Sequence, residues 1–287
     1  RWGALTVMTS SPWPALLWRL ALAAAHRDGP AIAGQERSAW AEAALCLAVQ
    51  PLSAEQGWAL LAEGLMAPQP GHFVQALREG GVLRQWLPEV DALFGVPELC
   101  DLPTPVDVGE HLLALLAETA RVDAPLNVRL AALLVPLGKP GSPREIWPSH
   151  YKHEQRAHAI ADALSTRLAW PGATLDLARL AIDEMERVHR ASDLRAGAIT
   201  ALLERLDALG RPERFEDLLL LCTCDFAAYP GHRPQDYPKA GRLRRALAAC
   251  RATPVAGLDA EAAQLRRAQA VHQALRGGLT ASLPPQP

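Results

Sequence analysis

Hydrophobic residues recur every three or four positions through most of the chain, which is the spacing of amphipathic helices. Ser53 and Gln56 fit a capping box that begins one such stretch, and Trp170–Gly172 forms a clear break between two others. The pattern predicts helices after Ser53, over Gly71–Arg78, and over residues 108–122, 128–137, 150–168, 174–189, 199–209, 214–228, 238–249 and 259–275. The run 128–137 is almost entirely apolar, so we expect that helix to be buried on every side.

The composition supports an all-α fold. Aromatic residues are 5% of the chain, so one of the residue groups that favour strands is scarce, whereas the helix formers Ala, Leu, Arg and Glu are abundant. At 287 residues the chain can bury a substantial core. Two polar, proline-containing loops interrupt the helical pattern, at Leu99–Pro105 and Lys139–Ser149, and we take the first as a candidate domain boundary.

The charge is nearly balanced, with 29 basic and 31 acidic side chains and a net charge of −2, which does not favour a strongly basic nucleic-acid-binding protein. A local basic cluster nevertheless occupies residues 239–276. One interpretation is a phosphate- or RNA-binding surface, and the other is a solvated helix face. The candidate phosphate-binding residues are Lys239, Arg242, Arg244, Arg245, Arg266 and Arg267.

Cysteine usage and hydropathy point to a cytoplasmic protein. The five cysteines are odd in number and widely spread, which is typical of reduced and mostly buried thiols rather than of a disulfide framework. The most apolar stretch, Trp13–Ala25, is short and contains Arg19, so we expect neither a membrane span nor association with a membrane.

The usual phosphate-binding loops, serine-hydrolase elbow and zinc-protease motif are missing from the sequence. There is also no D-x-D pair, of the kind that would hold the two metal ions of polymerase-type nucleotidyl transfer. Histidines are the remaining lead: His150 and His153 share a helix face if Ser149 caps that helix. Together with His111 and Asp225 from other helices they could ligate a metal ion, or they could be ordinary polar surface residues.

Several ordered segments carry a family resemblance over roughly residues 39–275. They include GHFVQALREGGVLRQWLPEVDALFGVPEL from Gly71, then IWPSHYKHEQRA, RPERFEDLLLLCTCDF and DYPKAGRLRRALAAC. These segments resemble the bacterial CCA-adding enzymes, the tRNA nucleotidyltransferases. The resemblance implies a helical neck and body followed by a helical HD-type phosphohydrolase domain. It predicts an N-terminal helical extension at 1–38, a neck/body-like region at 39–100, a degenerate HD-type domain at 101–276 and a flexible tail at 277–287.

The sequence departs from the family at its catalytic motifs. The family's nucleotidyltransferase head and its E-D-x-x-R motif have no counterpart within these residues. The His-Asp pair that names HD domains falls at Val135–Pro136, which offers no side-chain donor atom. A further family histidine falls at Met185, a poor ligand for hard metals, although His189 is retained. The Arg-Gly-Arg that follows the late aspartate is replaced by Ala227–Tyr229.

We therefore expect no intact catalytic site and no bound cofactor. The metal ligands that remain under the resemblance are His111, His150, His153 and Asp225. These substitutions predict a pseudoenzyme, a catalytically degenerate relative that serves as a binding scaffold, with tRNA or other structured RNA as the candidate partner.

Two alternatives stay open. The chain could be a residual phosphohydrolase acting on 2′,3′-cyclic or nucleotide phosphates, and only that function would require a divalent metal ion. It could instead be a protein-interaction module, either a homodimer or the partner of a separate nucleotidyltransferase chain. In that case Trp13, Trp18 or Trp40 would anchor the interface, unless these side chains belong to the core.

Overall fold

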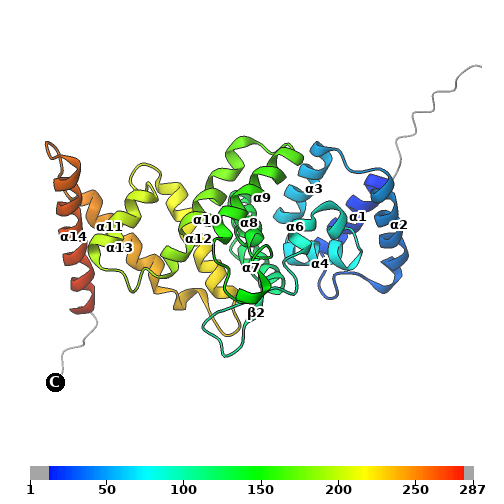
Figure 1. Cartoon of the computed structure of the whole chain (residues 1–287), viewed down its shortest axis with the longest axis horizontal. Coiled ribbons are helices and arrows are strands. Elements are labelled where there is room, and N and C mark those ends of the chain that lie inside the picture. Colours follow the sequence, from blue (N-terminus) through cyan, green and yellow to red (C-terminus); the bar gives the residue numbers. More distant parts are fainter. Residues whose placement is uncertain (1–12, 281–287) are drawn as a thin grey trace, which may run out of the picture.

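The computed structural model describes residues 13–280, with side chains over 13–276, and this part of the chain is built from fourteen α-helices and one short hairpin (Figure 1). The all-α prediction is confirmed. No helix in the described part is long and apolar enough to cross a membrane. The helices are α1 (Trp13–Ala25), α2 (Arg37–Val49), α3 (Ala54–Met66), α4 (Pro70–Glu79), α5 (Leu83–Trp86), α6 (Pro88–Asp91), α7 (Val108–Arg121), α8 (Leu126–Leu134), α9 (His153–Arg167), α10 (Asp176–His189), α11 (Ala196–Arg205), α12 (Pro212–Ala228), α13 (Pro238–Ala252) and α14 (Ala260–Thr280).

Local sequence signals explain where several helices begin. The backbone N–H of Gln56 donates to Ser53 Oγ at 3.2 Å, and the backbone N–H of Ser53 donates to Gln56 Oε1 at 3.0 Å, which confirms the capping box of α3. Asp107 caps α7 by accepting from the backbone N–H of Glu110 at 3.0 Å. Its other carboxylate oxygen accepts from the N–H of Gly95, so one side chain both starts α7 and holds the preceding turn.

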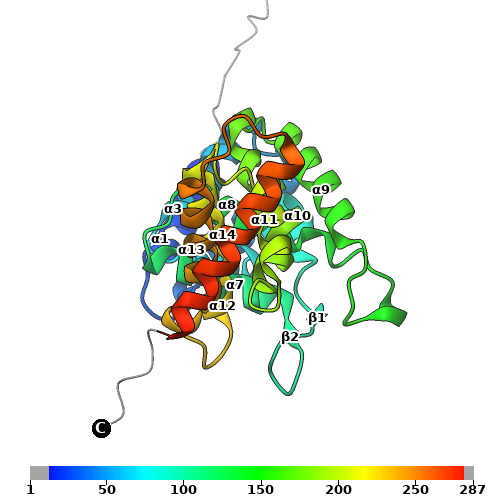
Figure 2. The ribbon, with the colours of Figure 1, turned by 90° about the vertical axis from the view of Figure 1, so that its left-hand side faces the viewer.

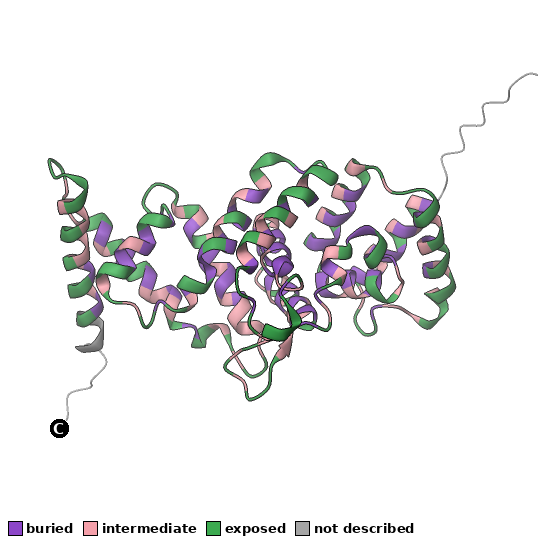
Figure 3. Cartoon of the chain, in the orientation of Figure 1, coloured by how far each residue is buried: buried purple, intermediate pink, exposed green. Residues whose placement is uncertain are grey.

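Helices α1–α6 lie at one end of the long axis of the molecule, α7–α10 and α12 lie in the middle, and α11, α13 and α14 lie at the other end (Figure 1). One continuous cluster of buried apolar residues extends from α1 to α14. Helix α8 lies at its centre, packed by α3, α7, α10 and α12, and its residues 128–134 are all buried, as the apolar run predicted (Figure 3). The middle helices α7, α8, α10 and α12 form the framework of the candidate site.

The tryptophans proposed as interface anchors belong mostly to the core. Trp13 and Trp40 are 4% and 1% exposed, and both pack within the buried cluster. Trp18 is half-buried against the same cluster and donates its indole N–H to Glu63. The role of Trp13 and Trp40 as exposed anchors is therefore wrong, because their positions on α1 and α2 face the inside of the N-terminal bundle.

Several element boundaries differ from the periodic pattern, and three of them change the local picture. Helix α9 begins at His153 and not at His150, because Lys152 adopts a left-handed backbone with φ = 59° that an α-helix cannot contain. Helix α8 ends at Leu134 and gives way to a 3₁₀ turn over Val135–Gly138. Helix α14 continues to Thr280, four residues into the predicted tail, and residues 281–287 lie outside the described part.

The loop Leu99–Pro105 connects a two-stranded antiparallel hairpin, β1 (Pro97–Glu98) and β2 (Val106–Asp107), which projects from the helices (Figure 2). The domain boundary proposed at this loop stays a prediction. Hydrogen bonds of buried side chains cross it. For example, Arg129 of α8 donates to the carbonyl oxygens of Leu65 and Ala67 at the end of α3, at 2.9 and 3.2 Å. Residues on the two sides of the loop are thus joined by hydrogen bonds.

Candidate functional site

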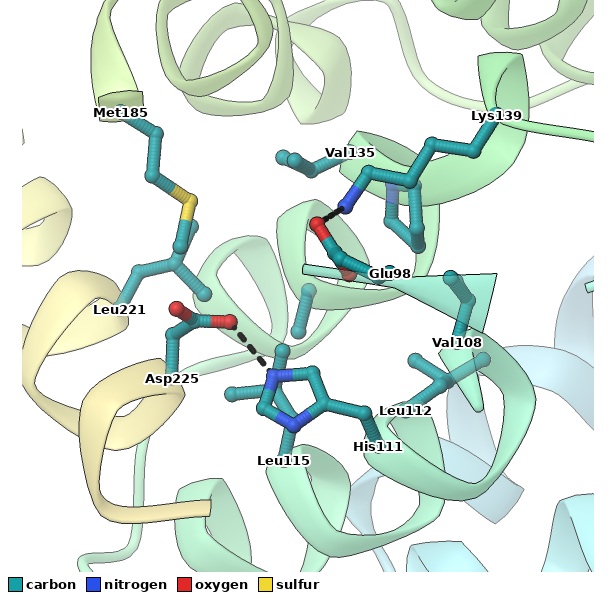
Figure 4. Close-up of a pocket in the computed structure, with 12 residues that line it drawn as sticks. Glu98, Val108, His111, Leu112, Leu115, Val135, Lys139, Met185, Leu221 and Asp225 are labelled. Carbon is teal, nitrogen blue, oxygen red and sulfur yellow. Dashed lines mark hydrogen bonds and ion pairs between the residues drawn. The ribbon is translucent and has the colours of Figure 1, made fainter. Parts of the chain in front are cut away.

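Asp225, near the end of α12, lies between histidines from two other helices. Nε2 of His111, on α7, is 2.9 Å from Asp225 Oδ1 (Figure 4). Nε2 of His189, at the end of α10, is 3.2 Å from Asp225 Oδ2, close but poorly aligned for a hydrogen bond. The structure therefore brings together two of the predicted ligands, His111 and Asp225, and adds His189 as the third member of the cluster.

Two tyrosines surround this cluster. The hydroxyl of Tyr237 lies 3.0 Å from Nδ1 of His189, and the ring of Tyr229 stacks on His111 with 4.1 Å between ring centroids. When His189 carries its proton on Nε2 toward the carboxylate, Nδ1 is free to accept from the Tyr237 hydroxyl. The polar groups then form one connected series of Tyr237, His189, Asp225 and His111, in which the contact between His189 and Asp225 is the poorly aligned one.

The electrostatics favour an ionised aspartate. Burial by itself would raise the pKa of Asp225, but the hydrogen bonds and charges of His111 and His189 outweigh it and hold this pKa well below its usual range. Burial raises the pKa of both Tyr229 and Tyr237 far above the ordinary tyrosine value, so both hydroxyls stay protonated. The cluster thus consists of one largely buried carboxylate between two imidazoles, with neutral phenols outside it.

Apolar side chains face the cluster where the resemblance places metal ligands. Val135 and Pro136, in the turn after α8, line the same cavity as Asp225, together with Met185 and Leu221 (Figure 4). The cavity has a volume of about 30 Å³, enough for one or two water molecules and far too small for a nucleotide. An ion pair between Lys139 and Glu98 also lines it.

The other two predicted histidines lie elsewhere. Nε2 of His150 donates to the carbonyl oxygen of Pro97 at 2.8 Å, and its Nδ1 lies 3.2 Å from Ser142 Oγ. Nδ1 of His153 is 2.9 Å from the carbonyl oxygen of His150. Both histidines line a separate cleft, so the structure does not bring them into one ligand set with His111 and Asp225.

The predicted basic cluster lies on α13 and α14, but several of its side chains already contact other groups of the protein. Arg242 donates to the carbonyl oxygens of Ala191 and Leu194, and Arg244 forms an ion pair with Glu216 at 2.7 Å. Arg267 is half-buried, and its buried Nε has no hydrogen-bond partner among the described residues. These three arginines therefore have less capacity for phosphate than their sequence positions indicate.

Three other members of the basic cluster form no ion pair within the described residues. Arg245 is exposed, and the Lys239 ammonium lies 5.4 Å from the centre of the Tyr237 ring. Within residues 13–276 neither side chain lies within 4 Å of a carboxylate. Arg266 is exposed and contacts only the backbone carbonyl of Pro254 among its described hydrogen bonds. Three of the six predicted residues are thus free of carboxylate partners within the described part of the chain.

The chain is similar to several proteins named multifunctional CCA protein. It is 40% identical over 211 residues to that of Acidovorax sp. (strain JS42), 40% over 228 residues to that of Dechloromonas aromatica, and 43% over 199 residues to that of Laribacter hongkongensis. By sequence, this chain is a relative of the multifunctional CCA proteins. These matches cover 74%, 79% and 69% of this chain and 50%, 55% and 49% of the relatives, so the chain spans about half the length of the CCA proteins it matches. No protein-family model matches it.

This relationship confirms the family resemblance and leaves the roles of individual residues as predictions. The sequence retains the family histidine at His189 but does not indicate that it lies beside Asp225. No motif marks Tyr229 or Tyr237, because the loop between α12 and α13 brings their rings to the cluster only in the folded chain.

Proposed function

We propose that this chain is a binding scaffold for structured, tRNA-like RNA, and that its HD-type site does not hydrolyse phosphate esters. The observation that carries the second statement is the closed arrangement around Asp225. Its carboxylate is held by His111 and His189, while Val135 and Pro136 line the space beside it. A catalytic metal centre needs a fixed ligand set with an open coordination position.

The residues present do not fit an HD-type metal centre. Val135 and Pro136 provide no side-chain donor, and the thioether of Met185 is a poor ligand for hard divalent ions. The three remaining donors are His111, His189 and Asp225, which already contact one another. We therefore derive no metal-dependent step for this site.

Support for RNA binding comes from kinship and charge. The sequence resembles enzymes that act on tRNA, and its relatives carry the name CCA protein. Lys239 and Arg245 on α13 and Arg266 on α14 form no ion pair with a carboxylate among the described residues. Side chains of this kind bind the phosphates of RNA by charge, with an affinity that falls steeply as salt increases.

Fluorescence anisotropy with a labelled tRNA transcript, at 50 and 200 mM salt, tests RNA binding. We expect saturable binding that weakens as salt increases. A plot of the logarithm of the binding constant against the logarithm of salt concentration should become shallower by roughly 0.7–0.9 for each phosphate contact removed. A Lys239→Ala/Arg245→Ala variant should therefore lose affinity and lower the slope, whereas Arg179→Ala, at an exposed ion pair on α10, should leave both unchanged. Absence of binding at 50 mM salt would reject the RNA scaffold.

A hydrolysis assay tests the other half of the proposal. Wild-type protein incubated with a chromogenic phosphodiester and Mn²⁺ or Ni²⁺ should show no turnover above the metal-only background. Turnover that disappears in the Asp225→Asn variant would instead establish the residual phosphohydrolase.

A further inference from the structure

His153, Glu154 and Glu186 converge outside the Asp225 cluster, where the beginning of α9 lies against the end of α10. Each offers one ligand atom, and these atoms all lie within 4.8 Å of one another. We propose that these three side chains bind a divalent transition-metal ion. This site is distinct from the Asp225 cluster and goes beyond the scaffold function proposed above.

The local fold holds His153 in place. Its side chain is largely buried, and Nδ1 lies 2.9 Å from the carbonyl oxygen of His150 and 3.8 Å from Glu154 Oε2. When Nδ1 donates to this carbonyl, Nε2 is the ring nitrogen left to bind a metal ion. A backbone carbonyl that accepts one ring N–H fixes the tautomer and orientation of an imidazole, an arrangement common to metal-binding histidines. Gly138 lets the backbone pack closely here: a Cβ atom at that position would lie 1.9 Å from the carbonyl oxygen of His153.

The two glutamates have the freedom to close around an ion. Two atoms bound to one metal at roughly 2.1 Å each cannot be more than about 4.2 Å apart, so the cluster must contract by about half an ångström. The side chains of Glu154 and Glu186 are 37% and 60% exposed and can make this small movement by rotation. Glu186 also pairs with Arg190 at 3.0 Å, but that ion pair is exposed on both sides and weak.

The donor set indicates the class of metal. One imidazole nitrogen and two carboxylates favour Zn²⁺, Mn²⁺, Co²⁺ or Ni²⁺ over Mg²⁺ and Ca²⁺, which prefer oxygen ligands alone. Two negative charges match a divalent cation. Three protein ligands leave at least one coordination position to water, and this position opens on the cleft lined by His150 and Tyr151.

Titration calorimetry with Zn²⁺, together with the absorption spectrum of added Co²⁺, tests the site without an activity assay. We expect one equivalent to bind wild-type protein, with affinity lowered tenfold or more in Glu154→Gln and in Glu186→Gln. Both substitutions replace accessible side chains of equal size, so the variants should fold, which circular dichroism checks. Glu213→Gln, at an exposed glutamate at the start of α12, serves as the matched control and should bind like wild type.

A His111→Gln variant separates this site from the Asp225 cluster and should retain full affinity. The proposal is overturned if wild-type protein binds no metal, if both glutamine variants bind like wild type, or if His111→Gln removes the binding. RNA binding does not enter these measurements, so failure of the metal site leaves the scaffold function untouched, and loss of RNA binding leaves the metal site untouched.

Discussion

The sharpest prediction concerns Asp225→Asn, which keeps the shape of the side chain and removes its charge. In the wild-type protein both carboxylate oxygens face imidazole N–H groups, at 2.9 Å from His111 and 3.2 Å from His189. An asparagine offers one acceptor oxygen and directs its amide N–H₂ group at the second imidazole. That histidine must then change tautomer or leave a donor unpaired, and a tautomer change at His189 would disturb its bond to Tyr237.

The size of the effect follows from these contacts. Hydrogen bonds to a charged group contribute about 1.5–3 kcal/mol each, and an unpaired buried donor costs a similar amount. The neutral amide is easier to bury than a carboxylate, which offsets part of the loss. We expect the free energy of unfolding at pH 7 to fall by about 2–3 kcal/mol, which lowers the melting temperature by roughly 3–5 °C in a chain of this size.

Denaturant unfolding followed by circular dichroism at several pH values measures this difference. Because the folded-state pKa of Asp225 is depressed, its stabilising contribution is present above the unfolded pKa of about 3.9 and is lost as pH falls through the folded pKa. The difference in unfolding free energy between wild type and variant should therefore become smaller only below about pH 4. Asp162→Asn, at an exposed pair with Arg179, is the control and should change stability by less than about 0.5 kcal/mol. An Asp225→Asn variant as stable as wild type would refute the structural role of the cluster and point to a strained, functional carboxylate.

Three further predictions concern other buried groups. Arg129→Met removes a buried guanidinium that donates to three backbone carbonyls, and thermal melting should show a loss of about 3–5 kcal/mol; a loss under 1 kcal/mol would contradict the bridging role. Gly138→Ala places a methyl group against the carbonyl oxygen of His153. The free energy of unfolding in urea should therefore fall by about 1–3 kcal/mol or more, and Zn²⁺ binding should weaken. Unchanged values would show that the turn adjusts to the methyl group. Burial lowers the pKa of His150 below its ordinary value, so its contribution to stability is present above about pH 6.5 and is lost as pH falls. The free energy of unfolding should be lower at pH 5.5 than at pH 7.5, and the His150→Gln variant should show a smaller difference between the two pH values. An equally large difference in the variant would assign the pH dependence to another group.

Much of the fold was predictable because helices are specified by residues only a few positions apart. The capping box at Ser53, the break at Trp170–Gly172 and the fully apolar run of α8 all act locally, and the structure shows each of them. Boundaries failed where tertiary contacts override the local pattern. The clearest case is His150, which bonds to Pro97, more than fifty residues away, while Lys152 turns the chain before α9 can begin.

The sequence by itself determined the helical class, the family relationship and the absence of donor atoms at Val135 and Pro136, because residue identity and spacing carry that information directly. Only the tertiary structure decided which polar groups meet. His111 and Asp225 are separated by 114 residues and touch because α7 and α12 pack together. Glu216 of α12 pairs with Arg244 of α13, twenty-eight residues further along the chain, only in the folded molecule. Contacts between distant helices depend on how whole surfaces fit together, and no short stretch of sequence contains that fit.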